Sequence, residues 1–109
     1  MTLNDIINVT SAEVLTDVDI SSKEATGCYV CDLLSLAMSK VQAGDVWITV
    51  QANVNIAAVS VLTEAACVLV AEGMFRDDSV IAKANNEGVA ILRTQMSAFG
   101  AAVEIGKML

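Results

Sequence analysis

Three short apolar runs, each followed by a stretch with helical character, constrain the fold of this chain more than any other feature. The runs cover residues 46–50, 67–70 and 89–92, and their spacing of about 22 residues is typical of strand–helix units. Successive apolar positions are expected of strands that are buried on both faces of a sheet. Such units join parallel strands by right-handed crossovers. The pattern therefore predicts an α/β fold in which three consecutive βα units form a mostly parallel sheet with helices on both faces.

Capping residues and glycines indicate where the helices of these units begin and end. Asn, Asp, Ser and Thr are favoured N-caps, and glycine commonly follows the last turn. The helices expected on this basis cover 55–66 with Asn53 or Asn55 as N-cap, the segment from Asp77 or Asp78 to Gly88, and the segment from Thr94 or Ser97 to about Lys107.

A short α/β portion is expected before the first of these units. We predict a helix over 2–8, strands over 13–15 and 27–30, and a helix over 33–42 capped by Asp32. No Gly/Ser-rich stretch or charge run divides the chain, so we expect residues 1–109 to form a single domain.

The composition excludes several classes of function. The net charge is −7 and histidine is absent. A protein that binds nucleic acid or an anionic membrane needs a basic patch, and the sequence shows none. It also shows no nucleophile–base pair and no phosphate-binding loop, so we expect no enzyme. The first residues have no signal-peptide pattern and the chain has 3 cysteines, so we expect reduced thiols and a cytoplasmic location.

Cys28 and Cys31 form a C-x-x-C pair that keeps a redox alternative open. A thiolate near a helix start is stabilised by the helix dipole, and such a pair is able to bind metal. Residues three apart in a strand point to opposite faces, however, and three cysteines without histidine are too few for an ordinary iron–sulfur cluster. We expect no metal and no cofactor, with an iron–sulfur cluster at Cys28 and Cys31 as the alternative.

Polar residues gather where the three predicted strands end. In an open parallel sheet, ligands bind beyond the carboxyl ends of the strands, where helix N-termini offer free N–H groups to an anion. Glu72 and Arg76 follow the second strand. Each residue alone is also explained as a cap or loop residue. The candidate ligand-binding set is Thr49, Gln51, Asn53, Asn55, Arg93, Thr94 and Ser97.

The order and spacing of several segments resemble the DRTGG-domain family. The segments are Gly27-Cys28-Tyr29-Val30-Cys31-Asp32 and the residues up to 35, then 44–50, 55–59 and 87–92. The motif that gives the family its name is expected at 70–77, and this sequence retains Gly73 of that motif. The resemblance implies a fold similar to the N-terminal domain of HPr kinase/phosphorylase. It also implies a regulatory or binding module that is usually oligomeric. Domains of this family occur within some phosphotransacetylases, beside CBS modules, and as free-standing proteins, some of which are linked to iron-only hydrogenases.

Two hypotheses about function follow. The first is a non-enzymatic regulatory module that binds a small anionic ligand, such as a nucleotide, or a partner protein. The second is an accessory protein of a redox system, linked to iron-only hydrogenase. In either case the apolar helices expected over 55–66 and 98–109 favour a homodimer, because burial of apolar faces is favourable and a two-fold axis lets one patch cover its own copy.

Overall fold

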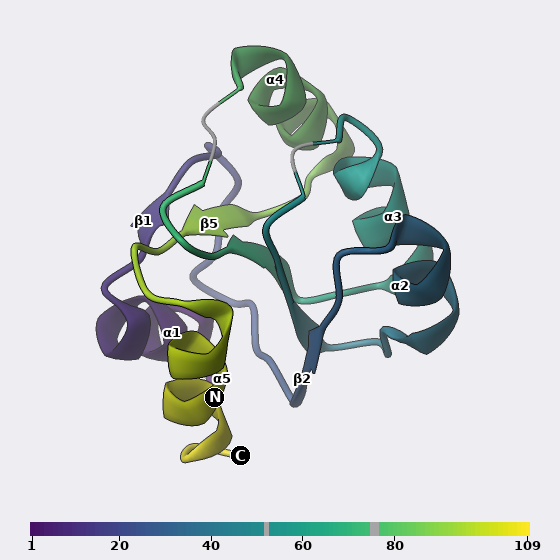
Figure 1. The fold of residues 1–109 in the computed structure, drawn as a ribbon. Coiled ribbons are helices and arrows are strands. Elements are labelled where there is room, and N and C mark those ends of the chain that lie inside the picture. Colours follow the sequence, from purple (N-terminus) through teal and green to yellow (C-terminus); the bar gives the residue numbers. More distant parts are fainter. Residues whose placement is uncertain (52, 75–76) are drawn as a thin grey trace.

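The computed structural model describes residues 1–51, 53–74 and 77–109, which form one sheet with helices on both of its faces (Figure 1). Among these residues, none of the helices has the length and apolar character that a membrane span requires. The elements, in chain order, are α1 (Leu3–Thr10), β1 (Glu13–Val14), β2 (Gly27–Val30), α2 (Leu34–Lys40), β3 (Asp45–Thr49), α3 (Ile56–Thr63), β4 (Cys67–Val70), α4 (Asp78–Glu87), β5 (Ile91–Arg93) and α5 (Ala98–Gly106).

The sheet is mostly parallel, as the spacing of the apolar runs predicted. Its strand order is β1-β5-β4-β3-β2. Strands β2 to β5 pair in parallel, whereas β1 pairs antiparallel with β5. The three predicted βα units are therefore adjacent and parallel, and the α/β fold is confirmed.

Strand β5 begins later than the apolar run suggested. Residues 89 and 90 were expected within it, but the strand starts at Ile91. Gly88 ends α4 with φ 72°, and the Val89 N–H donates to the Ala84 carbonyl at 2.9 Å. The end of the helix therefore uses residues that the hydrophobic pattern alone assigned to the strand.

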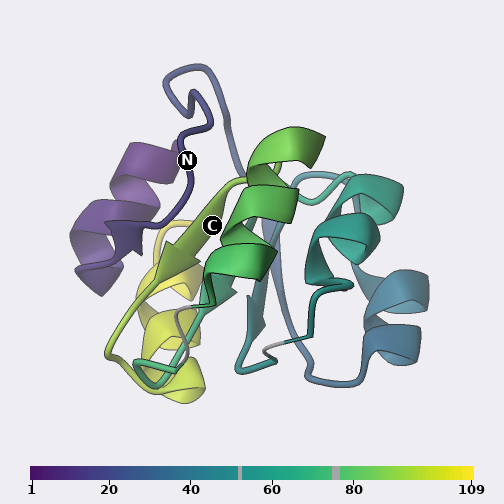
Figure 2. The same ribbon diagram turned by 90° about the horizontal axis from the view of Figure 1, so that it is seen from above.

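Two apolar cores cover the two faces of the sheet. Trp47 and Val68 lie in the core formed with α2, α3 and α4, whereas Val46 and Leu69 lie in the core formed with α1 and α5. Figure 2 shows α4, α3 and α2 following one another along their face. Alternate side chains of one strand point to opposite faces, so a strand between two cores has to be apolar at every position.

The N-terminal portion contains the expected elements with one correction. Thr2 caps α1, and strands β1 and β2 lie where they were predicted. Asp32, however, does not cap the helix that follows it. Helix α2 has Leu33 at its N-cap position and no side-chain cap. The carboxylate of Asp32 bonds to β3 instead.

Candidate functional site

The carboxyl ends of the parallel strands bring the predicted ligand residues to one edge of the sheet. The turns that follow β2, β3, β4 and β5 all start at this edge. Helices α3, α4 and α5 begin there, so their first N–H groups lie at the same edge. We call this region the carboxyl edge. Arg76, one of the residues expected there, lies outside the described residues.

Asp32 ties the turn after β2 to the end of β3. Its Oδ1 accepts hydrogen bonds from Thr49 Oγ1 and from the Val50 N–H, both at 2.9 Å. The Gln51 side-chain amide donates to the Asp32 carbonyl at 2.9 Å, and the Gln51 N–H donates to Thr49 Oγ1 at 3.1 Å. The Thr49 hydroxyl and the Gln51 side-chain NH₂ group are thus engaged within the protein. One signal of this arrangement was present in the sequence, since Asp32 follows β2 and Thr49 ends β3, and the two strand ends meet at one edge.

Asn53 and Asn55 lie before α3 and are exposed. Asn55 occupies the N-cap position, but neither side chain makes the capping bond that the sequence predicted. Asn53 Oδ1 instead accepts from the Asn55 N–H at 2.8 Å, which closes a local turn. Both residues thus lie exposed before a helix, with Asn53 Oδ1 engaged in this local hydrogen bond.

At the end of β5, three predicted ligand residues have structural partners. Arg93 Nη2 forms an ion pair with Glu13 Oε1 of β1 at 2.7 Å, and Arg93 Nε is buried with no hydrogen-bond partner among the described residues. Thr94 is buried and donates to the Thr10 carbonyl of α1 at 2.6 Å. Ser97 caps α5 by accepting from the Gly100 N–H at 3.0 Å, one of the two caps proposed for this helix. These contacts explain the polar residues here through the fold.

The turn after β4 has an unusual backbone. Glu72 and Gly73 have φ of 63° and 59°, and the Met74 N–H donates to the Ala71 carbonyl, as in a type I′ turn. The Glu72 and Gly73 N–H groups bond to the carbonyls of residues 96 and 94, each at 2.8 Å. A Cβ added at Gly73 would overlap the side chain of Gln95. Gly73, which the sequence assigned to the family motif, therefore holds this turn against the segment after β5.

Asp77 begins α4, as predicted. Its carboxylate accepts from the N–H and the hydroxyl of Ser79, at 2.9 and 2.7 Å. These hydrogen bonds hold the pKa of Asp77 below its ordinary value, because they stabilise the charged form.

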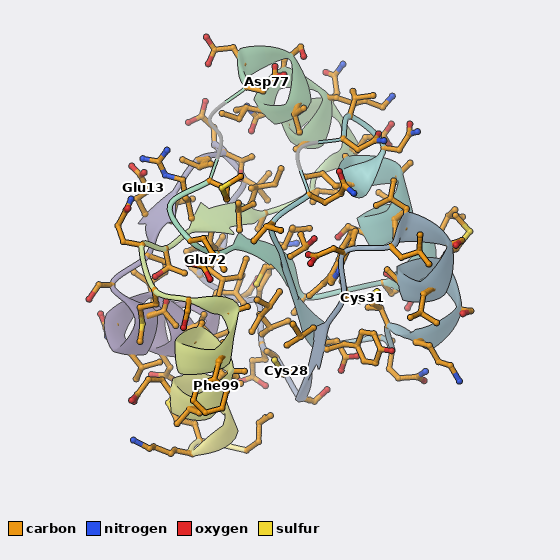
Figure 3. All side chains as sticks on the ribbon, in the orientation of Figure 1. Glu13, Cys28, Cys31, Glu72, Asp77 and Phe99 are labelled. Carbon is orange, nitrogen blue, oxygen red and sulfur yellow. The ribbon has the colours of Figure 1, made fainter. Side chains whose placement is uncertain are left out.

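Cys28 and Cys31 lie on opposite faces of the sheet. Cys28 packs against the core of α1 and α5, whereas Cys31 packs against the other core (Figure 3). Burial raises the pKa of Cys28 to about 11 and that of Cys67 to about 12. Among the described residues all three thiols are free, and no group of three His, Cys, Asp or Glu side chains is placed to hold a metal ion. Nothing in this geometry favours the iron–sulfur alternative at Cys28 and Cys31.

The carboxyl edge thus has polar groups but little that is free to react. Its side chains bond mainly to one another and to backbone, and the described residues form no cavity of ligand size. Helix N-termini and exposed asparagine amides are present. These N–H groups are able to donate hydrogen bonds to another molecule.

Comparisons with known proteins agree with the fold. A family model described as the DRTGG domain matches residues 5–108. No curated protein matches the chain. A solved structure, the CBS and DRTGG domains of the regulatory region of Clostridium perfringens pyrophosphatase in complex with its activator diadenosine tetraphosphate, superimposes with a TM-score of 0.81. The sequences are 19% identical over 99% of this chain and 47% of that chain. This chain therefore spans about half of that structure, and the likeness is one of fold.

Proposed function

Because this chain belongs to the DRTGG domain family, we propose that it is a non-enzymatic regulatory module that acts through contact with other protein chains, first of all with a second copy of itself. The observation that carries this proposal is the contrast between two parts of its surface. The polar groups of the carboxyl edge bond largely among themselves, whereas several large apolar side chains face solvent. Burial of such side chains against another chain is favourable, because it removes apolar area from water.

The exposed apolar side chains lie on the helices that the sequence associated with self-association. Val61 and Leu62 are exposed on α3, and Phe99 and Val103 are exposed on α5. Phe99 is 79% exposed. Aromatic side chains are enriched at the centres of protein interfaces, so Phe99 is the strongest single indication of a binding surface.

The related structure supports a regulatory role of this kind. In the Clostridium perfringens pyrophosphatase, a DRTGG domain is combined with CBS domains in a regulatory region that binds an activator. We infer that the present chain likewise carries regulation to other protein parts and catalyses no reaction itself. We expect it to work in the cytoplasm, where its three thiols stay reduced.

Sedimentation velocity tests the proposal directly. We expect a homodimer or a higher even oligomer at concentrations of roughly 1 to 100 μM, the range in which a dimer of micromolar affinity dissociates. A chain that stays monomeric throughout this range would contradict the proposal that it acts through a second copy.

A second candidate is nucleotide binding at the carboxyl edge, through Thr49, Gln51, Asn53, Asn55, Arg93, Thr94 and Ser97. The nucleotide activator of the related regulatory region favours it, as does the buried Arg93 Nε without a partner among the described residues. A thermal-shift measurement with ATP and with diadenosine tetraphosphate tests this candidate, because a ligand that binds the folded state raises the midpoint. Arg93→Gln should abolish the shift, whereas Lys107→Gln, far along α5, should not. No shift with either nucleotide would rule against them as ligands.

A further inference from the structure

The two edges of the sheet differ in how they are protected. Edge strands commonly carry charges, prolines or bulges that prevent pairing with another chain. Strand β1, at one edge, has two residues, and its Glu13 is paired with Arg93. Strand β2, at the other edge, is Gly27-Cys28-Tyr29-Val30, with neither a charged residue nor a proline. The β2 edge is therefore the one that is open to another strand.

Apolar side chains surround this open edge. Helix α5 packs beside β2, and Figure 3 shows Phe99 on the same side of the sheet as Cys28. Val30 is 48% exposed at the end of β2, and Val103 is 38% exposed one turn after Phe99. We call these four residues, Cys28, Val30, Phe99 and Val103, the β2–α5 face.

The carboxylates of Asp32, Asp45 and Glu104 lie near the β2–α5 face, and each has a partner within the fold. The Asp45 carboxylate, whose charge acts on Cys28, accepts from the Gln42 N–H at 2.8 Å. The Asp32 carboxylate accepts hydrogen bonds from Thr49 and Val50. Glu104 of α5 pairs with Lys107 at 3.2 Å. The face itself contains no ionisable carboxylate or amine. This neutrality matters in a chain whose net charge is −7, because two copies repel each other wherever their carboxylates approach.

We propose that the β2–α5 face binds a second copy of this chain, with the two β2 strands antiparallel across a two-fold axis and the two α5 helices on the same side of the joined sheets. This inference rests on the proposed function and specifies the surface that carries it. A second copy is the occupant that the charges favour, since the face lets two acidic molecules meet without burying an unpaired carboxylate. A strand edge in antiparallel register also complements itself, as a two-fold contact requires.

The area of the face shows how much of a standard contact it supplies. A fully exposed phenylalanine presents roughly 200 Å², so Phe99 at 79% exposure contributes roughly 150 Å². The four side chains together offer roughly 300 Å², against about 800 Å² that each partner buries in a standard complex. The face therefore forms the apolar centre of the contact, with β2 backbone and the exposed Leu33 around it. We expect a dimer that dissociates in the micromolar range.

Paired variants in the full chain test this surface. Val30→Lys and Phe99→Glu place a charge on the face, and Val61→Lys and Leu62→Glu place the same charges on α3, where the exposed fractions are similar at 44% and 68%. The first two should raise the dimer dissociation constant about tenfold or more, as expected when a central contact is lost. The α3 variants should change it by no more than about twofold. Circular dichroism identifies any variant that fails to fold, and Phe99→Glu, being outside the sheet, keeps the test valid if Val30→Lys unfolds.

The outcomes separate this inference from the proposed function. A wild-type dimer that is unaffected by the folded Val30→Lys and Phe99→Glu proteins would overturn the β2–α5 face and leave self-association standing. A wild-type monomer would overturn both. Salt adds a second readout, because screening reduces repulsion between two −7 chains. The dimer should become tighter as NaCl increases, and weakening with salt would show that ion pairs, rather than this neutral face, hold it together.

Discussion

Replacing Glu72 by glycine should stabilise the protein. Glu72 is the first central residue of the turn after β4 and has φ 63°. Its side chain is exposed, and no hydrogen bond joins it to another residue within 1–51, 53–74 and 77–109. A residue with a Cβ is strained in this left-handed region, where glycine is not.

The size of the effect follows from two opposing terms. Relief of the left-handed strain stabilises the folded state by about 1–2 kcal/mol. Glycine also makes the unfolded chain more flexible, which costs about 0.5–1 kcal/mol. The net gain should be about 0–1.5 kcal/mol with a central value of about 0.75 kcal/mol, which corresponds to an increase in Tm of about 3–6 °C for a domain of this size.

Thermal and urea unfolding of three variants check this reasoning. Glu72→Gly should raise Tm, and Glu72→Asn should raise it less, because asparagine tolerates positive φ better than glutamate. Glu72→Gln removes the charge but keeps the Cβ, so it should change stability by less than about 0.5 kcal/mol. A Glu72→Gly protein that is no more stable than wild type, beside an unchanged Glu72→Gln, would refute the assignment of strain to this backbone.

Three further predictions concern the core, the thiols and a helix cap. Trp47→Phe removes the hydrogen bond from Trp47 Nε1 to the Cys31 carbonyl, 2.9 Å long, and should lower the urea-derived unfolding free energy by about 1–3 kcal/mol; an unchanged value would show that the carbonyl finds another partner. Burial raises the pKa of Cys28 from 9.0 to about 11 and that of Cys67 from 9.0 to about 12. Above pH 9 the folded state therefore holds more protons than the unfolded state, and the free energy of unfolding should fall as pH rises above 9. Iodoacetamide should correspondingly modify Cys31 first at pH 8, and early modification of Cys67 would contradict its burial. Ser97→Ala removes the cap of α5 and should cost about 1 kcal/mol in thermal unfolding, whereas a neutral result would mean that solvent satisfies the Gly100 N–H equally well.

The candidate site was predictable only in part. The residues expected at the carboxyl ends of the strands lie at one edge wherever the structure describes them, because parallel strands end together. Asp32 was expected to cap a helix, and its bonds to Thr49 and Val50 could not be derived from local pattern. They depend on β2 lying beside β3, a neighbour relation between segments that are separated by a helix. Whether the predicted ligand residues bind a ligand stays a prediction.

Local information in the sequence determined the elements and the fold class. Apolar runs at successive positions specified strands buried on both faces, and Asp77, Gly88 and Ser97 marked helix ends through hydrogen bonds to nearby backbone. These features depend on residues only a few positions apart, so a single sequence contains them.

The tertiary structure decided how those elements meet. It put β1 antiparallel beside β5 and paired Arg93 with Glu13. It also left β2 at an edge and Phe99 of α5 in solvent. The physical reason is that burial of an apolar side chain lowers the free energy whichever apolar surface covers it, because the hydrophobic effect is non-directional. Hydrophobicity alone therefore does not identify the covering surface. That choice is made by the packing of the whole chain.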